Sequence, residues 1–310
     1  MAELIERLRL AMQRGELQLP VPGAGLTRQR HAALMEFGRK DLSFARLAEA
    51  HTDATAILAE ADRQPRSGAL YGVWAAEGPG STVQLSRGAG DTWRLQGAKR
   101  YCSGAPLLDA ALVTVRYRDS SAMLDVPLNA AGLRIDDGGW STPAFAETRT
   151  ATVTFDAVEL PHDCLIATED WYLRRAGFWH GAIGPASCWA GGAIGLVEAA
   201  RALGRRDPHS QAQLGALAAN AWAFAAVLNQ AGDEIDAAAK DSGSQARFRA
   251  LQVRHLIERL CTDTLDRFGR ATGPQLLAFD QDAARRYSEL TLYIRQCHAE
   301  RDLQAMLSAD

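Results

Sequence analysis

The chain lacks the residue pairs and glycine patterns that define several common sites. Its five cysteines are an odd number with no CxxC pair, so neither a disulfide framework nor a zinc site follows, and no metal site is predicted. Neither GxGxxG nor GxxxxGK[ST] occurs, which leaves a Rossmann or P-loop nucleotide site without support. The formal net charge of -3 gives no electrostatic reason to expect nucleic acid or an anionic membrane as partner.

The hydrophobic segments fit a globular protein better than a membrane protein. The opening residues 1–10 carry charges throughout, so they indicate an amphipathic helix rather than a secretion signal, and we expect a cytoplasmic protein. Residues 177–200 are long enough to cross a bilayer, but they are rich in glycine and alanine and contain Pro185. A buried, close-packed helix is therefore the favoured interpretation.

Changes in hydrophobic period divide the 310 residues into three parts. Residues 1–68 are helical in pattern, with a break at 19–25 and two helices joined near Asp41, which is the expected N-cap of the second. Between 69 and 165 the period becomes two, and about six short strands without intervening helices predict an antiparallel barrel or sandwich. From 166 to 310 the period returns to 3.6, which predicts a four-helix bundle whose last helix covers 280–307.

Two segments of the β region carry a family resemblance. Residues 74–81 read Trp-Ala-Ala-Glu-Gly-Pro-Gly-Ser, and residues 95–104 read Leu-Gln-Gly-Ala-Lys-Arg-Tyr-Cys-Ser-Gly. They resemble the flavin-binding middle of the acyl-CoA dehydrogenase superfamily, with its Thr-Glu-Pro, Gly-Ser, Leu-x-Gly-x-Lys and aromatic-x-Ser/Thr pattern. Residues 148–161 are similar to the closing β motif of that family, and the order of helices, β domain and helical bundle agrees. The N-terminal helical domain looks truncated by comparison.

The resemblance implies a FAD site and names its residues. A Ser103 hydroxyl is chemically apt, because a donor near flavin N5 and O4 stabilises the charge that develops on reduction. Ala76 stands where the family has a threonine that bonds the flavin. The implied cofactor-binding residues are Trp74, Ala75, Ala76, Glu77, Ser81, Tyr101, Cys102 and Ser103, with Arg205 and Arg270 for the phosphate and adenine half.

Each of these assignments has a simpler structural alternative. Aromatic residues on strands, such as Trp74 and Tyr101, usually fill cores. Arg205 also suits a helix C-terminus, which favours cations, and Gly273 followed by Pro274 is how a helix ends.

The C-terminal region leaves the chemistry open. The family's catalytic Tyr-Glu-Gly is absent from residues 286–302. On one continuous helix, Ile294 and His298 share a stripe, and a histidine on an apolar face is more often a core residue than a catalyst. The ending nevertheless resembles the flavin monooxygenase branch of the superfamily, in which a histidine serves proton transfer, so His298 is the catalytic candidate.

Three functions are carried forward. The first is a FAD-dependent oxidoreductase of the acyl-CoA dehydrogenase type, acting on the CH–CH group of an acyl thioester or related small molecule, with an acyl-CoA as a candidate substrate. The second is a monooxygenase or N-oxidising enzyme that uses reduced flavin on the same fold. The third is a degenerate homologue that serves as a binding subunit. The resemblance also implies a homodimer or homotetramer.

Overall fold

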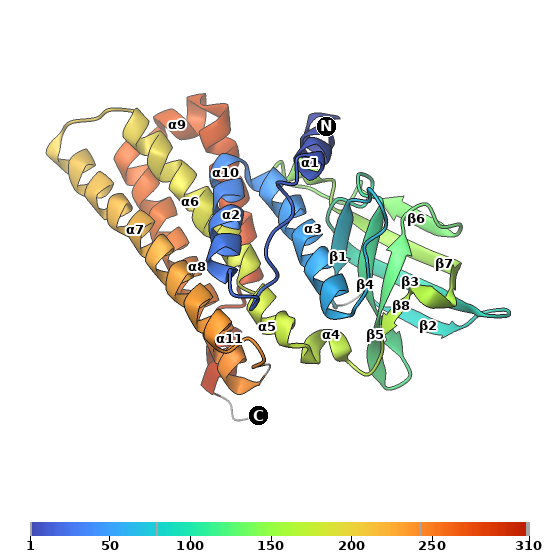
Figure 1. Cartoon of the computed structure of the whole chain (residues 1–310). Helices are drawn as coiled ribbons and strands as arrows, with labels where there is room; N and C mark the ends of the chain where they lie inside the picture. The colour runs from blue at the N-terminus through green and yellow to red at the C-terminus, as the bar shows by residue number, and fades with distance from the viewer. Residues whose placement is uncertain (1, 79, 242, 308–310) are drawn as a thin grey trace. The chain divides into compact units, whose positions relative to one another are not determined.

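The computed structural model describes residues 2–78, 80–241 and 243–307 (Figure 1). Pro79 of the first motif lies outside the described residues. The chain divides into two compact units, one built from residues 1–18 and 50–178 and the other from residues 19–49 and 179–310. We call them the β unit and the helical unit. The boundary at residues 49 and 50 falls inside one helix, α3 (Leu42–Glu60).

The β unit contains a mixed sheet. The described strands form an eight-stranded sheet in the order β6-β7-β3-β2-β4-β5-β8, with β1 paired to β4. The all-antiparallel expectation is wrong for two pairs, because β1 and β2 both run parallel to β4. The strands are β1 Tyr71–Trp74, β2 Val83–Arg87, β3 Thr92–Cys102, β4 Ala110–Tyr117, β5 Ser120–Pro127, β6 Leu133–Asp136, β7 Ala151–Pro161 and β8 Leu165–Ala167.

Strand β3 explains much of the second motif. Trp93 and Leu95 alternate inward and belong to the core, as period two predicts. Gly97 has φ +133°, and a Cβ there would overlap the carbonyl oxygen of Thr82, so only glycine allows this approach. The register against β7 shifts between Leu95 and Gly97 and again between Lys99 and Cys102. These irregularities change which side chains point inward at the end of the strand.

Most helices belong to the helical unit, where α6 is central. It packs on α2, α7, α8 and α10. Its bounds, Gly184–Ala202, fall in the long apolar segment, and Pro185 lies in its first turn, so the prediction of a buried helix is confirmed. The other helices are α1 Ala2–Gln13, α2 Thr27–Lys40, α4 Trp171–Arg174, α5 Ala176–Gly181, α7 Pro208–Ala237, α8 Ser244–Thr272, α9 Pro274–Phe279, α10 Gln281–Tyr293 and α11 Glu300–Leu307, with short 3₁₀ turns η1 Ala146–Thr148, η2 His162–Cys164 and η3 Ile294–Gln296.

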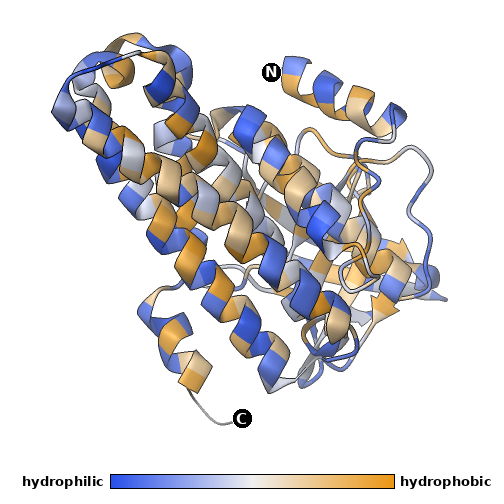
Figure 2. Ribbon diagram, turned by 60° about the vertical axis from the view of Figure 1, so that its left-hand side comes forward, coloured by the Kyte–Doolittle hydropathy of each residue, from blue (hydrophilic) through white to orange (hydrophobic). Residues whose placement is uncertain are grey.

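The long helices carry hydrophilic and hydrophobic residues along their length (Figure 2). Among the described helices, none has the length and apolar content needed to span a membrane.

The predicted N-cap at Asp41 is confirmed, since its Oδ1 accepts a hydrogen bond of 2.9 Å from the Phe44 backbone N–H. This cap ends α2 and starts α3 within one residue.

Helices α2 and α6 approach each other at glycines. A Cβ on Gly38 would overlap the carbonyl oxygen of Cys188. A Cβ on Gly191 would overlap the carbonyl oxygen of Met35 and lie 2.7 Å from the backbone nitrogen of Arg39. Backbone therefore meets backbone at this crossing, and neither helix has room for a larger residue.

Two buried histidines are held neutral. His31 donates from Nδ1 to the carbonyl oxygen of Leu228 at 3.0 Å, and burial lowers its pKa to about 4. His51 accepts the Tyr71 backbone N–H at Nδ1, at 3.2 Å, and burial likewise lowers its pKa to about 4. Because Nδ1 of His51 is the acceptor, its ring proton lies on Nε2.

These histidines predict acid lability. Between pH 6.5 and 4 the unfolded chain binds more protons than the folded chain, so the free energy of unfolding falls as the pH drops through this window. The stabilisation is fully present above pH 6.5, and each histidine accounts for about 3 kcal/mol of the loss. We expect the melting temperature to fall between pH 7.5 and 4.5, and His31→Gln to reduce that fall. The exposed His209 is the control, and an equal reduction in His209→Gln would contradict the assignment.

Candidate functional site in the β unit

The two sequence motifs lie against each other in the β unit. The indole Nε1 of Trp74 donates to the carbonyl oxygen of Ser103 at 3.3 Å. Ser81 Oγ donates to the carbonyl oxygen of Ala76 at 3.3 Å and accepts the Arg100 backbone N–H at 3.1 Å. Ser81, predicted to bind the cofactor, is buried and joins the two segments through these bonds.

The segment Trp74–Glu77 begins at the last residue of β1 and passes from the core to the surface. Trp74 is buried in the core, Ala75 is half-buried and Ala76 is exposed. Glu77 is also exposed and forms an ion pair of 2.8 Å with Arg116 on β4. A cavity of about 280 Å³ lies beside the segment. Its lining residues are Ala75, Glu77, Thr114, Arg116, Ser121, Asp170, Tyr172 and Leu173.

At the end of β3 the three predicted residues have different environments. Tyr101 has φ +60° and is 62% exposed, so it does not fill the core as strand aromatics usually do. Cys102 takes the core position, and burial raises the pKa of its thiol to about 12, which leaves it unreactive. The Ser103 hydroxyl accepts a hydrogen bond from Thr150 Oγ1 at 3.3 Å.

These groups suit an aromatic heterocycle with a polar edge. Tyr101 offers an exposed ring, Ser103 a hydroxyl, Ala75 a place in the lining of the cavity, and Ala76 an exposed position next to it. The contacts of Trp74 and Ser81 join the two segments to each other, which reduces the ordering cost of binding.

The sequence reasoning did not identify one buried charged residue of this region, Lys99. Lys99 is 1% exposed, and its Nζ donates to the backbone oxygen of Thr114 at 2.8 Å and to Thr114 Oγ1 at 2.9 Å. The sequence held a signal for it, because Trp93, Leu95, Gly97 and Lys99 share one face of a strand with period two. A lysine in that series is expected to point into the core.

In the helical unit, the two predicted arginines lie near the C-terminus of α8. Arg205 donates to the carbonyl oxygen of Ala271 at 3.3 Å. Arg270 is exposed and pairs with Asp266 at 2.9 Å. Gly273 ends α8 with φ +61°, and its N–H donates to the Gly269 carbonyl at 2.9 Å, so the predicted helix C-cap is confirmed. Arg205 thus serves a helix end, and a phosphate role for either arginine stays a prediction.

The structure places His298 differently from the expected helix stripe. Helix α10 ends at Tyr293 and a 3₁₀ turn covers 294–296. Ile294 is buried, whereas His298 lies in the link between this turn and α11 and has a half-exposed side chain. The single helix predicted over 280–307 is wrong, because hydrogen bonding changes at this turn. His298 Nδ1 lies 3.4 Å from Asp302 Oδ1, and its backbone N–H donates to Asp302 Oδ2 at 3.0 Å. The carboxylate therefore orients the imidazole.

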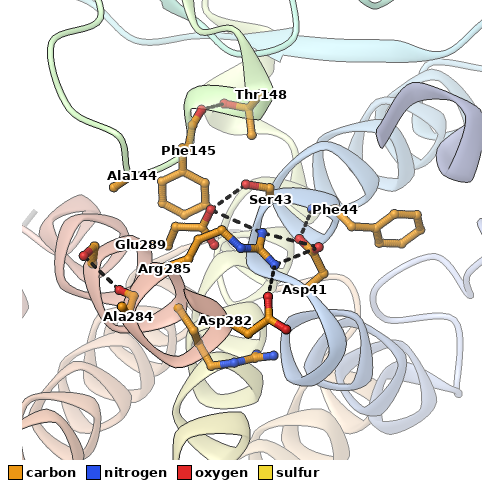
Figure 3. Close-up of polar contacts among 12 residues, drawn as sticks. Asp41, Ser43, Phe44, Ala144, Phe145, Thr148, Asp282, Ala284, Arg285 and Glu289 are labelled. Atoms are coloured by element: carbon orange, nitrogen blue, oxygen red, sulfur yellow. Dashed lines mark hydrogen bonds and ion pairs between the residues drawn. The ribbon is translucent and has the colours of Figure 1, made fainter. Parts of the chain in front are cut away.

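A buried carboxylate on α10 is already engaged (Figure 3). Glu289 is 2% exposed and accepts a hydrogen bond of 2.7 Å from Ser43 Oγ. Arg285 lies 3.7 Å from Glu289 and 3.4 Å from Asp41, so it bridges two buried carboxylates. Arg286 donates to the carbonyl oxygens of Gly38 and Lys40 at the end of α2. This cluster attaches α10 to the corner between α2 and α3.

Comparisons with known proteins support the fold. No protein-family model matches the chain, and no curated protein matches it significantly. Among solved structures, nitrososynthase from Micromonospora carbonacea var. africana has a TM-score of 0.82 at 18% identity, covering 98% of this chain and 90% of that one.

Two further structures are similar. One is TdsC, a dibenzothiophene monooxygenase from Paenibacillus sp. A11-2 that was solved with FMN and indole. It has a TM-score of 0.79 at 17% identity, and the match covers 98% of this chain and 94% of TdsC. The other is KijD3, solved with FMN and dTDP-3-amino-2,3,6-trideoxy-4-keto-3-methyl-D-glucose. It has a TM-score of 0.78 at 18% identity, and the match covers 90% of this chain and 78% of KijD3. At 17–18% identity these likenesses show the fold alone, and that fold agrees with the one that the sequence resemblance implied.

Proposed function

We propose that the chain is a flavin-dependent monooxygenase that oxidises a small organic molecule, with FMN as the flavin. The observation that carries this choice is the His298–Asp302 pair. A half-exposed imidazole oriented by a carboxylate is suited to moving a proton, as in other histidine–carboxylate pairs. The named activities of nitrososynthase and dibenzothiophene monooxygenase, and the FMN in two of the compared structures, support the same class.

In this proposal the residues of the β unit bind and orient the flavin. The backbone of Ala75 and Ala76 meets its polar edge, Ser103 donates to it, and Tyr101 packs on the ring. A bound flavin supplies two-electron redox chemistry. His298 exchanges a proton with the substrate, and Asp302 keeps its ring oriented. A homodimer or homotetramer is part of the proposal, as the family resemblance implies.

Dehydrogenation of an acyl thioester with FAD is the second candidate, supported by the order of the motifs. It needs a carboxylate base near the C-terminus. Glu289 is the buried carboxylate of α10, and its contacts with Ser43 and Arg285 already occupy it. Glu300 is exposed at the start of α11. Neither arrangement favours α-proton removal.

The deciding experiment measures flavin binding and oxygen use together. Purified protein incubated with FMN or FAD and freed of excess should retain the visible flavin bands, with FMN preferred. With chemically reduced FMN and a panel of small aromatic, amine and nucleotide-sugar substrates, we expect oxygen uptake coupled to product. His298→Ala should lower turnover about a hundredfold or more while leaving flavin binding unchanged.

Other outcomes identify the alternatives. Bleaching of bound FAD by an acyl-CoA without oxygen, retained in His298→Ala, would favour the dehydrogenase. A colourless protein with no thermal shift in excess oxidised or reduced flavin would favour the non-catalytic homologue, since a ligand of the native state must raise stability.

A further inference from the structure

Lys99 is a buried cation on β3 whose Nζ bonds go to neutral acceptors. Its two bonds end on Thr114, one on the backbone oxygen and one on the hydroxyl. Removing an ammonium from water is costly unless a partner compensates, and a methionine would fill the same space without that cost. The chain has only three lysines but 31 arginines, and Lys40 and Lys240 are both exposed. A charge retained at this position calls for an explanation beyond packing.

Thr114 connects Lys99 to the segment that precedes the cavity. Its Oγ1 accepts from Lys99 and lies 3.5 Å from the carbonyl oxygen of Trp74, to which it donates. Parallel pairing of β1 with β4 brings Trp74 opposite Val113, so Thr114 lies just beyond the last paired residue. Thr114 also lines the 280 Å³ cavity with Ala75 and Glu77. These hydrogen bonds therefore link the buried ammonium of Lys99, through Thr114, to Trp74, where the segment leaves the sheet.

The other end of the segment is held electrostatically. Glu77 pairs with Arg116 at 2.8 Å and also attracts the charge on Lys99. Three neighbours face Lys99: Glu77 on the segment and Cys102 on β3 favour its charged form, whereas Arg116 on β4 opposes it. Burial is the largest influence and lowers the pKa of Lys99 to about 8. The ammonium of Lys99 therefore loses its charge as the pH rises through about 8.

We propose that Lys99 and Thr114 are positioning residues that fix the Trp74–Glu77 segment, and that flavin binds well only when Lys99 carries its charge. The inference rests on the proposed function, because the flavin is the ligand whose binding it controls. Protonated Lys99 holds Thr114 and attracts Glu77, which keeps the backbone of Ala75 and Ala76 in one arrangement. Loss of the charge weakens both interactions at once.

The test begins with the protein free of flavin. Lysines labelled with ¹³C at Cε should give three resonances, and we expect the one that belongs to Lys99 to titrate near pH 8. Lys99→Met should remove this resonance. Hydrogen exchange of the peptide containing residues 74–78 should become faster in Lys99→Met and in Thr114→Val, whereas Thr114→Ser and Lys240→Met should match the wild type.

Flavin binding then supplies the pH profile. In the wild type, the Kd for FMN should rise roughly tenfold between pH 7 and 9.5, and the midpoint of this rise should match the pH at which the Lys99 resonance titrates. Lys99→Met should show the high Kd at both pH values. Lys240→Met should keep the wild-type profile. A wild-type profile in Lys99→Met, or a Lys99 resonance that titrates above pH 10, would overturn the proposal.

Failure of the proposed function gives a different result. If the wild type binds no flavin at any pH, the proposed function and the flavin part of this inference both fail. The exchange measurement still decides the positioning role, because it uses the protein alone. Unchanged exchange in both Lys99→Met and Thr114→Val would refute that role.

Discussion

Gly191→Ala is expected to destabilise the helical unit by roughly 3 kcal/mol or more, because the added methyl group overlaps backbone of α2. Side chains can rotate away from an intruding atom, but the carbonyl of Met35 and the N–H of Arg39 belong to a helix ladder. The helices must separate, and the contacts between α2 and α6 are lost over their length. We expect a melting temperature about 10 °C below that of the wild type.

A matched control tests the cause. Gly215 lies on α7, and a Cβ there meets nothing within 4 Å. Gly215→Ala should raise stability by up to about 1 kcal/mol, because alanine favours the helix and restricts the unfolded chain. Urea unfolding of both variants gives the comparison. A Gly191→Ala protein as stable as Gly215→Ala would show that α2 and α6 do not cross at the distance described.

Arg285→Met is expected to cost about 3–5 kcal/mol, because it removes the cation that bridges the buried carboxylates of Asp41 and Glu289. The two carboxylate side chains are 7% and 3% exposed, so water does not replace the guanidinium. Methionine keeps the length of the side chain, and the loss therefore measures charge rather than packing. The deficit should shrink as the pH is lowered from 7 to 5, since protonating a carboxylate removes the charge that has lost its bridging guanidinium.

The control for this variant is an exposed ion pair in the same unit. Arg28 and Asp233 are 3.3 Å apart, and both side chains are 53% exposed. Arg28→Met should change the free energy of unfolding by less than about 1 kcal/mol, as exposed pairs usually do. Thermal unfolding at pH 7 and pH 5 separates the two cases. Equal losses in the two variants, or a deficit in Arg285→Met that ignores pH, would contradict the buried-charge account.

The sequence predicted the parts that depend on local chemistry. Asp41 caps α3 and Gly273 ends α8, because short-range hydrogen bonds decide both positions. The motif order led to the correct fold. Within those motifs Gly97 allows a close backbone approach, and Ser81 joins the two segments of the β unit. The sequence therefore located the two motifs, but it did not show that Gly97 and Ser81 have roles in the fold.

Long-range features could not be read from periodicity. Alternation in Val113 and Val115 indicates a strand but not its partner, so the parallel pairing of β4 with β1 and β2 was missed. The apolar spacing that joins Ile294 to His298 continues through residues where the helix actually ends. Tyr101 turns outward because a register shift precedes Cys102, and a shift of that kind has no signature in the alternation itself.

The division of the chain between its units has a consequence for synthesis. Residues 19–49 belong to the helical unit, yet the rest of that unit starts at residue 179, 130 residues later. At the usual rate of translation, about 5–20 residues per second, α2 leaves the ribosome roughly ten seconds before α6 exists to cover it. The β unit can complete its sheet during that interval. We therefore expect the face of α2 that carries Leu34 and Gly38 to stay uncovered until α6 emerges, so that this helix joins its unit only late in synthesis.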